Sequence, residues 1–167
     1  MTVEIEGVIE AQLDVHADER GSFAEILRTA DVGVSFAQSN HSRSRARVLR
    51  GLHYHVHQGD LWYVVSGTAQ VALVDLRTPE EVTVRSLIMT SEDPRTVYIP
   101  PGVAHGFLAL TDLDLIYWVT RTYDASDEHG IAWNDPVLAI PWRTDDPILS
   151  PRDQNNPKLE WSKIPRF

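Results

Sequence analysis

The sequence predicts an all-β protein, a sandwich or barrel of jelly-roll type. Short runs rich in Val, Tyr and Trp recur through the middle of the chain, and several alternate apolar and polar residues as half-buried strands do. Gly and Pro separate these runs, as expected of turns. Long segments with the 3.6-residue period of an amphipathic helix are scarce, so helices should contribute little to the fold.

Each strand is predicted from its own stretch of sequence. Residues 61–77, LWYVVSGTAQVALVDLR, read as two strands joined by a hairpin turn at Ser66-Gly67-Thr68. Residues 82–90, VTVRSLIMT, alternate well, and residues 113–123, LDLIYWVTRTY, form another β-branched and aromatic run. Residues 96–110, TVYIPPGVAHGFLAL, read as a strand, a Pro-Pro-Gly turn and a second strand.

The two remaining segments differ from the strands. Residues 22–32, SFAEILRTADV, are the single fair helical candidate. Residues 133–157 are rich in Pro and Asp, and we expect them to wrap the surface as an ordered loop that packs down through Trp133, Trp142 and Leu149. Because the chain contains no linker, repeat or low-complexity block, we predict one domain over residues 1–167.

Composition excludes several classes of function. The 167 residues include 15 Lys and Arg against 24 Asp and Glu, a net charge of −9, which disfavours binding to a nucleic-acid polymer or an anionic membrane. The absence of cysteine excludes disulfides, thiolate catalysis and Cys-ligated zinc. No apolar run approaches the roughly 20 residues that span a bilayer, and the acidic N-terminus is unlike a signal peptide. We therefore expect a soluble cytoplasmic protein.

The stretch GLHYHVHQGD, residues 51–60, carries three histidines at alternate positions, which strand geometry places on one face. With Pro100-x-Gly102-x2-His105 it resembles the two-part signature of the cupin superfamily. That resemblance implies a cupin-type jelly roll (double-stranded β-helix) with short helical segments and an irregular C-terminal tail. It also makes a divalent metal site possible; the candidate ligands are His53, His55, Asp60 and His105. For His57, near a turn, we expect only ordinary hydrogen bonding.

A closer resemblance extends over nearly the whole chain. Its motifs, in order, are DERGSFAE (18–25), FAQSNHSRS (36–44), VLRGLHY (48–54), IPPGVAHGFLAL (99–110), YDASDEHGIAWNDPVLAIPW (123–142) and PILSPRD (147–153). Together they resemble the dTDP-4-dehydrorhamnose 3,5-epimerase family, a cupin-fold group. The resemblance implies epimerisation at C3, C5 or both of a 4-keto-6-deoxyhexose carried on a nucleoside diphosphate, most simply dTDP, in deoxysugar biosynthesis. It implies no metal or nicotinamide cofactor.

Epimerisation next to a ketone requires a base, a group that stabilises the enolate, and an acid on the other face. The resemblance assigns the base to His53, and the orienting carboxylate to Asp153. It assigns the proton donor to Tyr117. An imidazole suits proton abstraction near neutral pH, and a carboxylate on its other nitrogen would raise its basicity.

The same resemblance gives a set of substrate-binding residues. Arg20 and Arg50 would bind phosphate oxygens, and Tyr123 would stack on the thymine ring. Further substrate contacts are expected from Glu25, Gln38, Asn40, His105 and Glu128. Family members of this kind are homodimers that exchange strands, so Arg20 and Glu25 would reach into the neighbouring subunit's site.

The chain departs from the family pattern at two positions. Asp60 stands where the family carries a catalytic-site lysine, and His55 stands where it carries glutamine. Three interpretations remain open. The protein is an epimerase that stabilises its enolate with Tyr117, His105, Arg50 or another group. Alternatively, the histidines and Asp60 bind a metal that replaces the lysine. In the third, the protein is a catalytically silent sugar-nucleotide binder.

Overall fold

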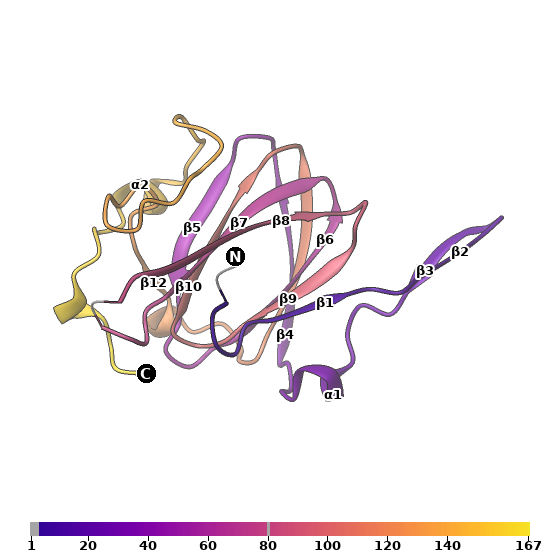
Figure 1. Ribbon diagram of the computed structural model, residues 1–167, viewed down its shortest axis with the longest axis horizontal. Coiled ribbons are helices and arrows are strands. Elements are labelled where there is room, and N and C mark those ends of the chain that lie inside the picture. Colours follow the sequence, from indigo (N-terminus) through magenta and orange to yellow (C-terminus); the bar gives the residue numbers. More distant parts are fainter. Residues whose placement is uncertain (1–3, 80) are drawn as a thin grey trace.

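The computed structural model describes residues 4–79 and 81–167 and confirms a cupin-type jelly roll built from two five-stranded antiparallel sheets (Figure 1). The first sheet has the order β1 (Ile9–Gln12), β9 (Arg95–Ile99), β6 (Asp60–Ser66), β11 (Leu113–Val119) and β4 (Gln38–Ser44). The second has the order β12 (His129–Gly130), β5 (Leu49–Tyr54), β10 (Val103–Ala109), β7 (Thr68–Asp75) and β8 (Thr83–Thr90).

Alternation along the strands divides the apolar residues into two cores. In β7, Val71 and Leu73 join the core between the sheets, where they meet residues such as Val64 of β6. Ala72 and Val74 join a second core on the outer face of the same sheet. β7 is therefore buried on both faces, which explains why its sequence reads as a nearly continuous apolar run.

The turn at Ser66-Gly67-Thr68 is not the predicted hairpin. β6 pairs with β9 and β11, whereas β7 pairs with β10 and β8, so the single residue between them takes the chain from one sheet to the other. Gly67 has φ +89°, and a Cβ there would lie 2.1 Å from the carbonyl oxygen of Asp112. A side chain cannot fit such a corner, so the glycine marks a change of sheet.

The Pro-Pro-Gly turn also joins the two sheets. It connects β9 of the first sheet to β10 of the second, so the predicted order of strand, turn and strand is correct. At both turns, the strand before the turn and the strand after it therefore belong to different sheets.

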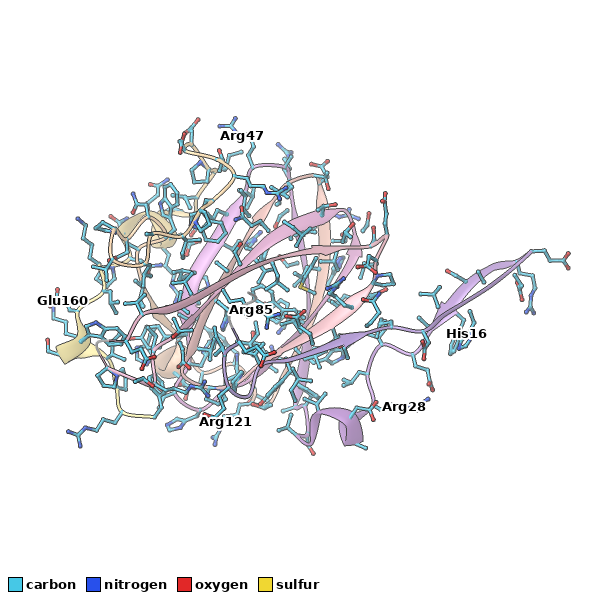
Figure 2. All side chains as sticks on the ribbon, in the orientation of Figure 1. His16, Arg28, Arg47, Arg85, Arg121 and Glu160 are labelled. Carbon is cyan, nitrogen blue, oxygen red and sulfur yellow. The ribbon has the colours of Figure 1, made fainter. Side chains whose placement is uncertain are left out.

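The helix predicted over residues 22–32 is largely wrong. Within that range only Thr29–Val32 is helical (α1), and Ser22–Ala24 belong to β3 (Gly21–Ala24). β3 pairs with β2 (Val15–Asp18) in a hairpin that we call the N-terminal arm, which projects from the body (Figure 1). Figure 2 shows His16 of the arm well away from the two main sheets. Phe23 of β3 is 65% exposed, so the first part of the predicted helix has no buried face to stabilise it.

The segment 133–157 packs against the outer face of the second sheet, as predicted, and contains one short helix, α2 (Pro151–Asn155). Trp142 packs against the outer core and its indole N–H donates to the carbonyl oxygen of Trp133 over 2.9 Å. Trp133 and Leu149 are half-buried. Two 3-10 turns, η1 (Ala125–Asp127) and η2 (Trp161–Lys163), complete the described elements. Within the described ranges, every helix is too short or too polar to cross a lipid bilayer.

Candidate active site

A cavity of about 510 Å³ lies between the sheets and is lined by residues of both. All but two of the residues predicted for the site line this cavity, namely Gln38, Asn40, Arg50, His53, His105, Tyr117, Tyr123, Glu128 and Asp153. Trp62, Phe107 and Leu115 are buried and form its apolar floor. Because these residues come from both halves of the chain, the fold, and not sequence proximity, assembles the site.

His53 and Asp153 form a hydrogen-bonded pair in this cavity. The Nε2 atom of His53 lies 2.7 Å from Oδ1 of Asp153, and the carboxylate is almost fully buried. A carboxylate accepts hydrogen bonds, so in the neutral ring Nε2 carries the proton and Nδ1 keeps its lone pair. This arrangement gives His53 a basic nitrogen and gives the imidazolium that forms on protonation a fixed counter-charge.

Asp153 is held by the start of α2. Ser150 is the N-cap of the helix, and its hydroxyl donates to Oδ2 of Asp153 over 2.9 Å while accepting from the Asp153 backbone N–H over 3.1 Å. Burial alone would raise the pKa of Asp153, but hydrogen bonds from His53, Ser150 and the Gly51 N–H lower that pKa below its ordinary value. The carboxylate therefore stays ionised beside the imidazole.

Tyr117 enters the cavity from β11 in the opposite sheet, where it pairs in register with Asn40 of β4 and Trp62 of β6. Burial raises the pKa of the Tyr117 phenol, and the nearby Asp60 raises it further, against a smaller opposing effect of Arg50. The phenol therefore remains protonated at neutral pH and can donate a proton.

Amide side chains form one polar wall of the cavity. Gln38 and Asn40 alternate along β4, and the Gln38 Nε2 donates to Oδ1 of Asn40 over 2.8 Å. Gln38 Oε1 in turn accepts the backbone N–H of Tyr123 over 3.1 Å, which fixes the base of an aromatic side chain that is 68% exposed. Arg50, held by its Nε bond to Ser44 Oγ at 3.0 Å, supplies a guanidinium to the same cavity.

Glu128 and Arg152 form an ion pair on another side of the cavity. Burial would raise the pKa of Glu128, but the hydrogen bond and charge of Arg152 lower it below the ordinary value. Neither group is therefore a free charge. Arg152 was not among the residues predicted for the site, although it stands inside the PILSPRD motif.

His55, Asp60 and His105 gather near the floor. Candidate ligand atoms of the three side chains all lie within 4.8 Å of one another. Burial lowers the pKa of His105 to about 4, against the opposing effect of Asp60, so its ring is neutral at pH 7. His53 does not belong to this group, although sequence spacing placed it among the possible metal ligands.

Two of the residues predicted for the site, Arg20 and Glu25, lie elsewhere. Arg20 turns at the tip of the arm, where it pairs with Asp18, and Glu25 follows the arm and pairs with Arg28. Neither lines the cavity of its own chain. His57 is exposed and does not line the cavity, because β5 ends at Tyr54 and the strict alternation ends with it.

Two residues that sequence reasoning missed have clear roles. Ser150 orients Asp153, and Trp62 closes the floor, its ring edge-on to that of His105 at 5.3 Å between centroids. The Ser-x-x-Asp spacing at 150–153 is a capping signature that could have revealed the first. No comparable local signal singles out Trp62 from the other strand tryptophans.

Comparison with known proteins shows the family to which the chain is similar. A family model for dTDP-4-dehydrorhamnose 3,5-epimerase matches residues 2–160. The chain is 38% identical over 148 residues to the spore coat polysaccharide biosynthesis protein SpsL of Bacillus subtilis, which covers 84% of this chain and 98% of that protein. It is 39% identical over 163 residues to a dTDP-4-dehydrorhamnose 3-epimerase of Streptomyces niveus, over 90% of this chain and 79% of that one.

A solved structure is similar over the full length of the chain. The dTDP-6-deoxy-D-glucose-3,5-epimerase of Legionella pneumophila, in complex with dTDP-4-keto-L-rhamnose, superposes with a TM-score of 0.89 at 32% identity. The match covers 100% of this chain and 97% of that one.

Proposed function

Because the chain belongs to the dTDP-4-dehydrorhamnose 3,5-epimerase family, we propose that it is an isomerase acting on a nucleoside-diphosphate-linked 4-keto-6-deoxyhexose. It inverts C3, C5 or both in deoxysugar biosynthesis. The observation that carries this proposal is the His53–Asp153 pair on one wall of a cavity whose opposite sheet presents Tyr117. The pair and the phenol can serve as the base and the acid that proton removal and return beside a ketone require.

The proposed reaction moves protons without any redox change. His53 Nδ1 takes the proton from the carbon next to the ketone, and the C–H electron pair moves into the enolate. Asp153 stabilises the imidazolium from the other side of the ring. The Tyr117 hydroxyl then returns a proton to the opposite face of the carbon, which inverts the centre.

The remaining cavity residues suit the two ends of a sugar nucleotide. Arg50 would bind diphosphate oxygens through its planar guanidinium. The exposed ring of Tyr123 would stack on the base, and Gln38 and Asn40 would bind polar edges of base or sugar. His105 and Glu128 would contact the sugar. The Legionella relative binds a dTDP-linked keto sugar, which supports dTDP as the carrier here.

The test is deuterium wash-in. Incubation with dTDP-4-keto-6-deoxyglucose in D2O should place deuterium on C3, C5 or both, as read by NMR and mass spectrometry. The ratio of the two positions reports which centre is inverted. Failure to exchange with any 4-keto nucleotide sugar would overturn the proposal, and nucleotide binding without exchange would identify a silent binder instead.

The proposal also includes a homodimer in which the N-terminal arm of each subunit contributes to the site of the other. The expected location is the cytoplasm. The arm supports the homodimer because Phe23 is 65% exposed on a hairpin that contacts little of its own body (Figure 2). Arg20 and Glu25 would complete the neighbour's site. Sedimentation should give a dimer for the wild type and a shift toward monomer for Phe23→Asp. A wild-type monomer with full exchange activity would contradict this part of the proposal.

A further inference from the structure

The cluster near the cavity floor is chemically separate from the base. His55 follows β5, Asp60 begins β6 and His105 lies in β10, so the three side chains come from both sheets. Their ligand atoms lie within 4.8 Å of one another, and His105 Nε2 is 3.8 Å from Asp60 Oδ2. His53 instead points its Nε2 at Asp153. The mechanism proposed above assigns no role to His55 or Asp60.

Backbone carbonyls fix the tautomers of the two imidazoles. His55 Nδ1 lies 2.8 Å from the carbonyl oxygen of Asp127, and His105 Nδ1 lies 3.0 Å from that of Val103. A carbonyl oxygen can only accept, so each Nδ1 carries the hydrogen, and each Nε2 of a neutral ring carries a lone pair. Metal-binding histidines are oriented by this kind of second hydrogen bond.

Asp60 has a buried negative charge with no fixed cation beside it. Its two oxygens accept from neutral donors, Gln58 Nε2 at 2.9 Å and Trp62 Nε1 at 3.3 Å. Among residues 4–79 and 81–167, no lysine or arginine forms an ion pair with it. A buried carboxylate close to the candidate ligand atoms of two imidazoles is unfavourable unless a positive charge lies between them. The arrangement therefore points to a cation.

We propose that His55 Nε2, the Asp60 carboxylate and His105 Nε2 bind one divalent first-row transition cation. Two nitrogens and one oxygen favour such an ion over Mg²⁺ or Ca²⁺, which prefer oxygen ligands alone. Bonds of about 2.0–2.2 Å require ligand atoms roughly 3.0–3.5 Å apart, so the cluster must contract by about 1 Å. His55 stands just beyond the end of β5 and is half-buried, which allows that movement.

The site and the base coexist in this geometry. Because His53 is held by Asp153 and lies outside the ligand set, metal binding leaves its Nδ1 available for proton abstraction. A bound cation would supply positive charge for the enolate oxygen, the role that the family resemblance assigns to a lysine at the position of Asp60. That role rests on the proposed function, whereas the binding site itself does not.

The test measures binding directly. Protein purified without a histidine tag is treated with EDTA, dialysed and titrated with Zn²⁺ and Co²⁺, by calorimetry and by the visible absorption of Co²⁺. We expect one cation per chain. His105→Ala, Asp60→Asn and His55→Gln should each weaken binding by about 100-fold or more, since even partners outside the ligand set contribute about 10- to 100-fold.

The matched control is His57→Ala, which removes an exposed histidine from the same stretch and should leave the affinity unchanged. Circular dichroism establishes that each variant is folded, and His55→Gln carries the test if Asp60→Asn unfolds. Absence of binding, or equal binding by wild type and all three ligand variants, would overturn the site. Loss of binding in His57→Ala would likewise overturn it, by placing the cation at the surface.

The two proposals fail in different ways. Zn²⁺ binding with no deuterium exchange on any 4-keto nucleotide sugar would sustain the site and overturn the proposed function. Full exchange by EDTA-treated protein that binds neither cation would overturn the site and leave the epimerase intact.

Discussion

His53 and His55 are two residues apart and line the same cavity, but they use different ring nitrogens in their hydrogen bonds. His53 gives its Nε2–H to a carboxylate, so Nδ1 keeps the lone pair of the neutral ring, whereas His55 gives its Nδ1–H to a carbonyl, so Nε2 keeps it. The carboxylate can compensate an imidazolium and the carbonyl cannot do so fully. The first histidine is thereby suited to accept a proton, and the second to bind a cation.

The partner atom, more than the residue type, decides what each histidine can do. A third histidine has a carboxylate partner but lies outside the cavity. His41 Nε2 lies 2.9 Å from Asp114 Oδ1, and the His41 side chain is 56% exposed. Solvent screens that pair, and neither His41 nor Asp114 lines the cavity of about 510 Å³. It provides a matched control for the buried His53–Asp153 pair.

The largest effect should come from removing the base. His53→Ala should slow deuterium exchange by about 1,000-fold or more, because general base catalysis contributes roughly 10²- to 10⁴-fold. Exchange is followed by NMR in D2O under saturating substrate. His41→Ala removes a histidine with the same kind of partner and should exchange at the wild-type rate. Equal losses in the two variants would contradict the assignment of the base.

The second-largest effect on deuterium exchange should come from Asp60, which lies beside His55. Asp60→Asn keeps the shape but removes the charge, and should reduce exchange by about 100-fold, the magnitude typical of losing one electrostatic stabiliser of an oxyanion. Single-turnover exchange measures it. An Asp60→Asn variant that exchanges faster than wild type would show that the carboxylate opposes the enolate and that its charge is not neutralised by a cation.

A smaller effect should follow from loosening the partner of His53. Ser150→Ala removes one hydrogen bond to Asp153 and the N-cap of α2, worth about 1 kcal/mol each. We expect exchange to fall about five- to tenfold and urea unfolding to show the stability loss. Ser150→Thr keeps a hydroxyl and should restore the exchange rate. A purely structural defect in the helix would not predict that the rate and the stability recover together.

The smallest effect should appear in acid. The pKa of Asp153 is lowered in the folded protein, so the unfolded chain binds its proton first as the pH falls below the ordinary value of 3.8. Stability contributed by Asp153 is thus present above that pH and is lost as the pH falls through the lower folded-state value. Urea unfolding below about pH 4 should show a shallower decline for Asp153→Asn than for wild type. Parallel declines would remove Asp153 as the cause.

Local alternation predicted the strands from β6 to β11, and the ordered motifs shared with the family predicted most of the residues that line the cavity. The sequence could not predict that Gly67 turns the chain into the other sheet, since a glycine turn serves a hairpin and a corner equally well. It also grouped His53 with His55 and Asp60. Their separation depends on Asp153 and on the Asp127 carbonyl, which lie 100 and 72 residues away.

The N-terminal arm and the residue after it include two predicted site residues that the sequence could not place relative to the cavity. Arg20 and Glu25 belong to the expected site by motif but lie away from the cavity of their own chain. The role proposed for both residues requires a second subunit, which one sequence does not specify. The helix expected over residues 22–32 was wrong at its start, where Ser22–Ala24 belong to β3 and Phe23 is 65% exposed.

The corners at Gly67 and at Pro100-Pro101-Gly102 have a kinetic consequence. Each turn places consecutive strands in opposite sheets, so few strand pairs can form as local hairpins. Strands that are far apart in the sequence must therefore meet before most of the pairs can form. Asp60 and Tyr117 belong to one sheet while His53 and His105 belong to the other. The site therefore comes into existence only when the sheets join, and recovery of activity during refolding should follow the slowest step of assembly.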